Sequence, residues 1–215
     1  MTSRSVLLGS ALALALTLPL TAQAETKGFY IGAGAGANFA TDSASTTAAG
    51  SNKVRYEVGP SGLVTVGYGF GAFRSELEGS YRTNDVSGTR GAFLGNAGGS
   101  AQTWSLMVNG LYDIDTGTRF TPYLGAGIGV GFVNASLSGT RAAGSTLGLY
   151  NGSDTTLAYQ AIGGVSYAVT PKLSLTVDYR YVATTDASVN SGGTSWNVEN
   201  ASHVFTTGFR WALGN

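Results

Sequence analysis

The chain has no cysteine, only four prolines and one histidine among its 215 residues. Without cysteine it can form no disulfide, and it can use neither a catalytic thiolate nor a cysteine-ligated metal. Four prolines are too few for a collagen-like or proline-rich disordered chain. We therefore expect a fold that holds together without covalent cross-links, and we expect no metal and no cofactor.

Charge is also scarce. Charged residues make up 11% of the chain, which is about half of their usual share in a soluble domain. Twelve basic and twelve acidic residues balance to a formal net charge of 0. Such a chain has no electrostatic means of recruiting nucleic acid, so we expect no nucleic-acid partner.

Residues 1–24, MTSRSVLLGSALALALTLPLTAQA, have the layout of a secretory signal peptide. Arg4 supplies a positive head, an apolar stretch follows, and the small residues Ala22 and Ala24 occupy the positions that a signal peptidase reads. The apolar stretch is too short for a membrane-spanning helix. We predict cleavage after Ala24 and a single mature domain over residues 25–215.

Beyond the signal peptide the dominant pattern is alternation with a period of two, which indicates β-strands. In FRSELEGSY, for example, Phe73, Leu77 and Tyr81 fall on one face, whereas Glu76 and Glu78 fall on the other. The alternation predicts eight strands, at about 28–39, 60–70, 73–82, 103–113, 119–133, 156–168, 172–182 and 202–213.

The predicted connections alternate between short and long. The long ones are rich in Ser, Thr, Gly, Ala and Asn and have few large apolar residues to bury. Short turns at one end and long loops at the other are typical of an eight-stranded antiparallel up-and-down transmembrane β-barrel of the bacterial outer membrane. The predicted long loops span about 40–59, 83–102, 134–155 and 183–201.

A soluble lipocalin-like barrel would show the same alternation, but the aromatic residues favour the membrane barrel. They gather on the apolar face near the two ends of the strands, with small or aliphatic residues between them, as in the interfacial girdles of membrane barrels. One girdle is predicted to comprise Phe29, Phe70, Phe73, Tyr112, Phe120, Tyr167 and Trp211, and the other Phe39, Tyr81, Trp104, Phe132, Tyr159, Tyr181 and Phe205.

Glycine and charge on the opposite face support the same interpretation. The glycines would weaken an exposed sheet, but inside a narrow barrel they leave room for large groups from other strands. We expect those groups to form a lumen ion-pair network of Arg74, Glu76, Glu78, Arg82, Asp178, Arg180 and Arg210. Within it, Glu76 and Glu78 should meet Arg180 and Arg210 across the lumen, because buried charges must be paired.

Six segments resemble successive strands of the OmpA-like and opacity-protein-like family of small outer-membrane β-barrels: GFYIGAGAGANF, VTVGYGF, FRSELEGSYR, TPYLGAGIGVGF, LSLTVDYRYV and HVFTTGFRW. The resemblance covers essentially the whole mature chain. It implies termini in the periplasm, four surface loops and a place in the Gram-negative outer membrane. It also implies contact with outer-membrane lipid and lipopolysaccharide, and delivery by periplasmic chaperones and the barrel-assembly machinery.

The C-terminus departs from the family pattern. Members of this family commonly end on an aromatic residue that the assembly machinery reads, whereas this chain ends RWALGN. OmpA-type proteins can also carry a peptidoglycan-binding domain after the last strand. Because the sequence stops at Asn215, we expect no such domain here.

Three functions fit such a barrel. A lipid A deacylase would need a histidine and a serine that converge, but Ser202 and His203 lie on opposite faces of the last strand, so we expect no enzyme and no catalytic residue. A narrow porin-like channel is the alternative, although eight strands leave little open lumen. We expect a structural surface antigen or adhesin whose loops bind a host or environmental ligand. Tyr150 and Trp196 either provide contact points or pack onto the barrel rim.

Overall fold

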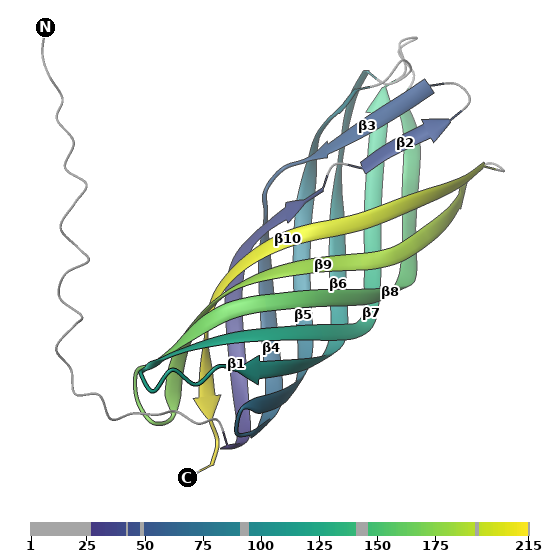
Figure 1. Cartoon of the computed structure of the whole chain (residues 1–215). Helices are drawn as coiled ribbons and strands as arrows, with labels where there is room; N and C mark the ends of the chain where they lie inside the picture. The colour runs from purple at the N-terminus through teal and green to yellow at the C-terminus, as the bar shows by residue number, and fades with distance from the viewer. Residues whose placement is uncertain are drawn as a thin grey trace, which may run out of the picture.

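The computed structural model describes residues 27–41, 43–47, 50–90, 95–140, 146–191 and 194–214. The predicted signal peptide, residues 1–24, lies outside the described residues. Ten strands run in chain order (Figure 1): β1 Lys27–Ala40, β2 Ser43–Thr47, β3 Gly50–Tyr56, β4 Gly59–Phe70, β5 Phe73–Arg90, β6 Gly95–Asp113, β7 Phe120–Thr140, β8 Thr146–Ala168, β9 Leu173–Ser191 and β10 Thr194–Ala212.

Eight of these strands close into a barrel. The ring runs β1, β4, β5, β6, β7, β8, β9 and β10, and β10 returns to pair with β1, so that every neighbour in the ring is antiparallel. The predicted fold class is confirmed. Within the described ranges, no helix is long and apolar enough to cross a membrane.

The pairing register fixes the tilt of the strands. Following paired residues once around the ring from Phe39 leads through His203, Tyr181 and the remaining strands to Phe29, which is a stagger of 39 − 29 = 10 residues. Ten residues of about 3.3 Å, spread over eight spacings of about 4.8 Å, correspond to a strand tilt of about 40°. The barrel is narrow enough for side chains to fill its interior.

Alternation along each strand sorts residues to the inside or the outside. On β5, Leu77 points outward and is 51% exposed, whereas Glu78 points inward and is 1% exposed. The same alternation runs through β6, where Leu106 and Val108 are exposed and Met107 is buried between them. An apolar exterior around a polar interior is the arrangement that a lipid environment requires.

The structure places all fourteen predicted girdle aromatics on the outer surface. Twelve are exposed, and Tyr81 and Tyr167 are half-buried. Near the short turns, Phe73 packs against Tyr112 at 5.0 Å between ring centres. Toward the other end, Tyr81 packs against Trp104 at 4.6 Å. Aromatic pairs therefore bridge neighbouring strands at both ends of the barrel.

The two ends of the barrel differ in their connections. Short segments at 71–72, 114–119 and 169–172 join strands at one end, where β1 also begins and β10 ends (Figure 1). Gly71 has φ of 99°, which the tight turn between β4 and β5 requires and which glycine adopts without a steric penalty. The long hairpins all project from the other end.

Much of each segment expected to be a long loop is strand in the structure. β5 continues to Arg90, and β6 already begins at Gly95. The later strands extend in the same way into the segments expected to be loops. The first expected loop contains a hairpin of its own, β2 and β3, which pairs with the far part of β5. Antiparallel pairing satisfies the backbone without needing an apolar face, so a polar composition did not prevent strand formation.

We predict that spin labels on the outward residues Leu77, Ile128 and Val177 will be accessible to oxygen dissolved in the bilayer. A label at the inward residue Ser80 should not be, because its side chain is buried in the lumen. The chain has no native cysteine, so each introduced cysteine carries the only label. The measurement is power-saturation electron paramagnetic resonance in lipid vesicles. High oxygen access at Ser80 with low access at Leu77 would contradict this sidedness.

Candidate functional site

Among the residues whose side chains the structure describes, eight charged ones are buried in the lumen. They are four arginines and four carboxylates, so their charges cancel. These residues are Arg74, Glu76, Glu78, Arg82, Asp113, Asp178, Arg180 and Arg210. They come from β5, β6, β9 and β10, and each lies at an inward position of the alternation. All seven residues predicted for the lumen network are in this set, and Asp113 is the additional member.

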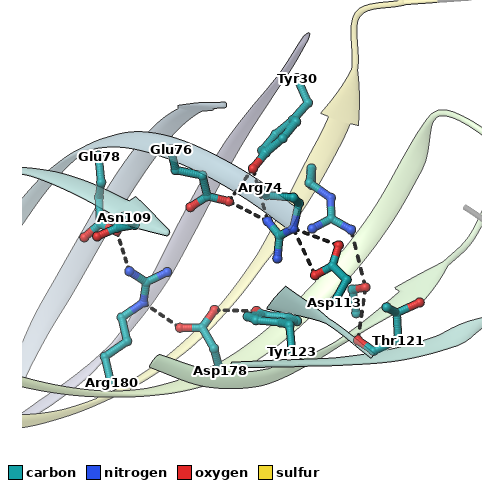
Figure 2. Close-up of polar contacts among 12 residues, drawn as sticks. Tyr30, Arg74, Glu76, Glu78, Asn109, Asp113, Thr121, Tyr123, Asp178 and Arg180 are labelled. Carbon is teal, nitrogen blue, oxygen red and sulfur yellow. Dashed lines mark hydrogen bonds and ion pairs between the residues drawn. The ribbon is translucent and has the colours of Figure 1, made fainter. Parts of the chain in front are cut away.

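The first group of charges is centred on Arg74, and we call it the Arg74 triad: Arg74, Glu76 and Asp113. Arg74 Nε donates to both carboxylate oxygens of Asp113, at 2.9 and 2.8 Å, and Nη1 donates to Glu76 Oε1 at 2.6 Å (Figure 2). The hydroxyl of Tyr30 donates to the same Glu76 oxygen at 2.7 Å. The triad carries one net negative charge.

The second group, the Arg180 triad, has the same plan: Arg180, Glu78 and Asp178. Arg180 Nη1 lies 2.5 Å from Glu78 Oε2, and Nε lies 2.6 Å from Asp178 Oδ1. Tyr123 donates its hydroxyl hydrogen to Asp178 Oδ2 at 3.1 Å. Because β9 supplies the arginine and β5 supplies Glu78, this triad spans the lumen (Figure 2).

Amide side chains complete the environment of Glu78. Asn109 Nδ2 donates to Glu78 Oε2 at 2.7 Å, and Gln160 Nε2 donates to the same oxygen at 3.2 Å. Gln160 also donates to Asn109 Oδ1 at 2.8 Å. A buried carboxylate is tolerated only when such hydrogen bonds replace its lost hydration.

Only part of the cross-lumen pairing expected from the sequence is found among the described ion pairs. Arg180 reaches Glu78, but Glu76 pairs with Arg74 of its own strand and not with Arg210. Arg74 and Glu76 are two residues apart and face the same way, about 6.6 Å apart along the strand. Arg74 therefore reaches Glu76 without crossing the lumen.

Of the four buried lumen arginines among the described residues, two lie outside both triads. Arg210 is 5.6 Å from the centre of the Tyr30 ring, and its Nη2 lies 3.5 Å from Ser166 Oγ. Arg82 donates from Nη2 to Ser105 Oγ at 3.0 Å. Among the ion pairs within the described residues, neither arginine takes part. Their two positive charges balance the net negative charges of the two triads.

The sequence did not lead us to the uncharged residues that donate hydrogen bonds to the buried carboxylates. Tyr30, Asn109, Tyr123 and Gln160 all hydrogen-bond to a triad carboxylate. Each falls at an inward position of its strand. Tyr30 and Tyr123 lie on the polar face, away from the outward girdle aromatics, and that placement was the signal that could have identified them.

Glycines make room for these side chains. A methyl group at Gly67 would overlap the ring of Tyr30. A methyl group at Gly164 would lie 2.6 Å from Cζ of Tyr123, and one at Gly127 would meet Asn109. Glycine on the polar face thus allows large inward side chains from neighbouring strands to lie across the lumen, as close packing inside a narrow barrel requires.

Small cavities remain between the described lumen side chains, and two of them adjoin buried arginines. One, of about 20 Å³, lies toward the hairpin end and is lined in part by Asn38, Arg82 and Thr184. The other, of about 40 Å³, lies between the two triads and is lined in part by Arg74 and Arg180. Volumes of this size accommodate one or a few water molecules.

The one histidine does not converge with the neighbouring serine. Ser202 is buried in the lumen, whereas the ring of His203 lies on the outer side between Tyr179 and Tyr181, at 6.0 and 5.4 Å between ring centres. His203 Nδ1 is 2.7 Å from the Tyr179 hydroxyl. This arrangement provides no pairing of a serine nucleophile with a histidine base.

Comparisons with known proteins agree with this architecture. The family described as outer membrane protein beta-barrel domain matches residues 8–211. An outer membrane protein of Gluconacetobacter diazotrophicus is 30% identical over 241 residues, which cover 98% of this chain and 64% of that protein. Major surface antigen 4 of Anaplasma marginale is 32% identical over 132 residues, covering 51% of this chain and 42% of that protein. This chain therefore spans less than two thirds of the length of these curated relatives.

A solved structure shares the fold. The crystal structure of Neisserial surface protein A has a TM-score of 0.55 and 25% sequence identity, and the match covers 87% of this chain and 98% of that one. The likeness extends over nearly all of the described barrel.

We predict that Glu78→Gln lowers the free energy of unfolding by about 3 kcal/mol, because it removes the buried charge that Arg180 contacts. Glu57→Gln is the matched control, since Glu57 is exposed at the rim, and it should change stability by less than about 0.5 kcal/mol. Urea unfolding in detergent micelles, followed by tryptophan fluorescence, measures both. Equal effects at the two positions would show that the Arg180 triad does not stabilise the barrel.

We also predict that Gly67→Ala destabilises the barrel by about 1–3 kcal/mol, because the added methyl group overlaps the Tyr30 ring. Gly110→Ala is the control, since a methyl group there meets nothing within 4 Å. The same urea titration reports both changes. In a Tyr30→Ala background the effect of Gly67→Ala should largely disappear. A loss that persists in that background would mean that the ring is not the cause.

Proposed function

This chain belongs to the outer membrane protein beta-barrel domain family, and from that premise we propose that it is a surface antigen or adhesin-like protein. In this proposal the barrel is a rigid support in the outer membrane, and the hairpins at one end contact molecules outside the cell. The lumen is plugged by its two arginine-centred triads. No catalytic step is part of the proposal.

The difference between the two ends of the barrel is the observation that carries this proposal. At one end the connections are short, and both the first and the last strand terminate there. At the other end, β5 to β10 continue as paired hairpin arms, and β2 and β3 add a further hairpin against β5. Extended arms on a rigid scaffold are suited to binding, because the scaffold holds them in place while their ends vary.

Two relatives support a role at the cell surface. One is named Major surface antigen 4 and the other Neisserial surface protein A, and their matches cover 51% and 87% of this chain. Both names describe a place at the surface. We extend that place to this chain, with the hairpin end outward and the short turns in the periplasm.

The plug accounts for the charged lumen without a transport function. Within the described barrel, six of the eight lumen charges belong to two triads that extend across the interior. The cavities beside them hold about 20 and 40 Å³, far less than a solute channel needs. The triads would therefore act as the core of the protein, in the place that a hydrophobic core has in a soluble domain.

Export and assembly follow the same proposal. Cleavage of residues 1–24 would release a chain that periplasmic chaperones carry to the barrel-assembly machinery. The exposed apolar exterior would then face outer-membrane lipid and, in the outer leaflet, lipopolysaccharide. Tyr150 lies within β8 and Trp196 within β10. We expect the side chains of Tyr150 and Trp196 to make surface contacts. Both lie outside the set of side chains that the structure describes.

We predict that cells producing the full chain adhere more strongly to wells coated with host extracellular matrix than cells without it. Shortening the hairpins should abolish this increase in adhesion. Each cut is closed with Asn-Gly, a dipeptide that favours a two-residue hairpin. Three of the four cuts join residues that pair across a hairpin, so the barrel register is kept. These cuts join Val86 to Gly99, Ala135 to Gly152 and Ala187 to Val198. The fourth cut removes residues 43–56.

Two controls accompany this adhesion assay. An epitope tag in the 114–119 turn should be detected only after the outer membrane is permeabilised, which tests the orientation. Heat-dependent migration on gels shows that each shortened chain still forms a barrel. Adhesion that survives removal of all four hairpin ends, in cells with the chain correctly oriented, would overturn the proposal.

A further inference from the structure

Arg82 is the last buried charge on β5 before the strand enters its hairpin arm. Its side chain is 7% exposed and faces the lumen. The guanidinium carries five N–H donors, and among the described side chains it donates to Ser105 Oγ at 3.0 Å. It lies outside both triads, so this cation has no carboxylate in contact among the described residues.

Beside Arg82 is the partly open cavity at the hairpin end of the lumen. Hydroxyl and amide groups surround it, and none of its lining residues is acidic; the polar ones besides Arg82 are Asn38, Asn84, Thr103, Thr184 and Ser202. The hydroxyls of Thr103, Thr184 and Ser202 can donate hydrogen bonds to a group that enters the cavity. A cation with surrounding hydroxyl donors is the chemistry that binds an anion.

The nearest charges do not neutralise Arg82 through direct contact. Glu78 and Arg180 are both within electrostatic reach, with opposite effects on it. Glu78 is already bound by Arg180, Asn109 and Gln160 through one carboxylate oxygen. Arg82 therefore lines the cavity without an ion pair to the Arg180 triad.

Arg210, a buried arginine at the other end of the lumen, has different surroundings. It is also 7% exposed, but it lies over the ring of Tyr30 at 5.6 Å, where the aromatic face stabilises the cation. Arg74 repels this cation, and the carboxylates of Asp113 and Glu76 attract it. Arg82 has no aromatic ring in this role among the described cation–aromatic contacts.

We propose that Arg82 and the surrounding hydroxyls form a binding site for one small monovalent anion, a carboxylate or a halide, at the hairpin end of the lumen. The cavity of about 20 Å³ exceeds what a single water needs, so it receives a chloride or the leading oxygen of a carboxylate. The guanidinium binds the anion, and the hydroxyls set its position. The site goes beyond surface contact by the hairpins and requires only that the barrel is folded.

The test uses the full folded chain in detergent micelles and the side-chain Nε–Hε signals of its arginines in nuclear magnetic resonance spectra. Sodium formate is titrated at constant ionic strength, which is maintained with a sulfonate buffer too large for the cavity. The Arg82 signal, assigned from its loss in Arg82→Lys, should shift along a saturating curve with a dissociation constant on the order of millimolar. A second titration with sodium chloride distinguishes a halide from a carboxylate preference.

Matched variants separate this site from general effects of salt. In Arg82→Met, which has no Arg82 signal, binding is followed through the backbone amide signals of Thr103, Thr184 and Ser202, which line the cavity. It should weaken at least about tenfold, because the charge-assisted hydrogen bonds are lost. Arg210→Met should leave the saturating shift of Arg82 unchanged. Should Arg82→Met fail to fold, Thr184→Val combined with Ser202→Ala removes two donors while keeping the charge, and binding should weaken several-fold.

Shifts that stay linear in formate and in chloride, or that are equal at Arg82 and Arg210, would overturn the site. So would saturation that persists in folded Arg82→Met. Because binding is measured on purified protein and adhesion on cells, the outcome here is independent of the outcome for surface contact.

Discussion

Backbone hydrogen bonding is the constraint on which this structure depends. In a bilayer each unpaired N–H or C=O costs several kcal/mol, so a sheet can cross only if it closes on itself. Here the pairing of β10 with β1 and of β5 with β6 leaves no open edge in the barrel wall. Closure then divides every strand into an outward and an inward face. Lipid requires the outward face to be apolar, and the inward face must fill an enclosed and narrow space.

The filling of that space is polar, and its charges are balanced. Each of Arg74 and Arg180 bridges two carboxylates, and a tyrosine donates to one carboxylate of each triad. The remaining two arginines restore neutrality, one against an aromatic ring and one beside the cavity at the hairpin end. Removing one partner would leave an uncompensated charge in the lumen, so each triad depends on its arginine and on both carboxylates.

Much of the barrel was predictable because alternation is a local property. The eight wall strands, their faces and the seven charged lumen residues all follow from reading every second residue. The hairpin arms were not predicted, since composition reports what can be buried and says nothing of backbone pairing. The partner of Glu76 was also missed: Arg74 on its own strand was nearer than Arg210. Tyr30 and Tyr123 were not predicted, because aromatic residues were expected on the outward, lipid-facing side of the strands.

The sequence by itself determined which side chains face lipid and which face the lumen, because a period of two assigns faces whatever the rest of the fold does. Only the tertiary structure decided which lumen charges meet. A stagger of ten residues around eight strands brings Arg180 of β9 level with Glu78 of β5, and Asp113 of β6 level with Arg74. That stagger is a property of the closed ring, and no single strand encodes it.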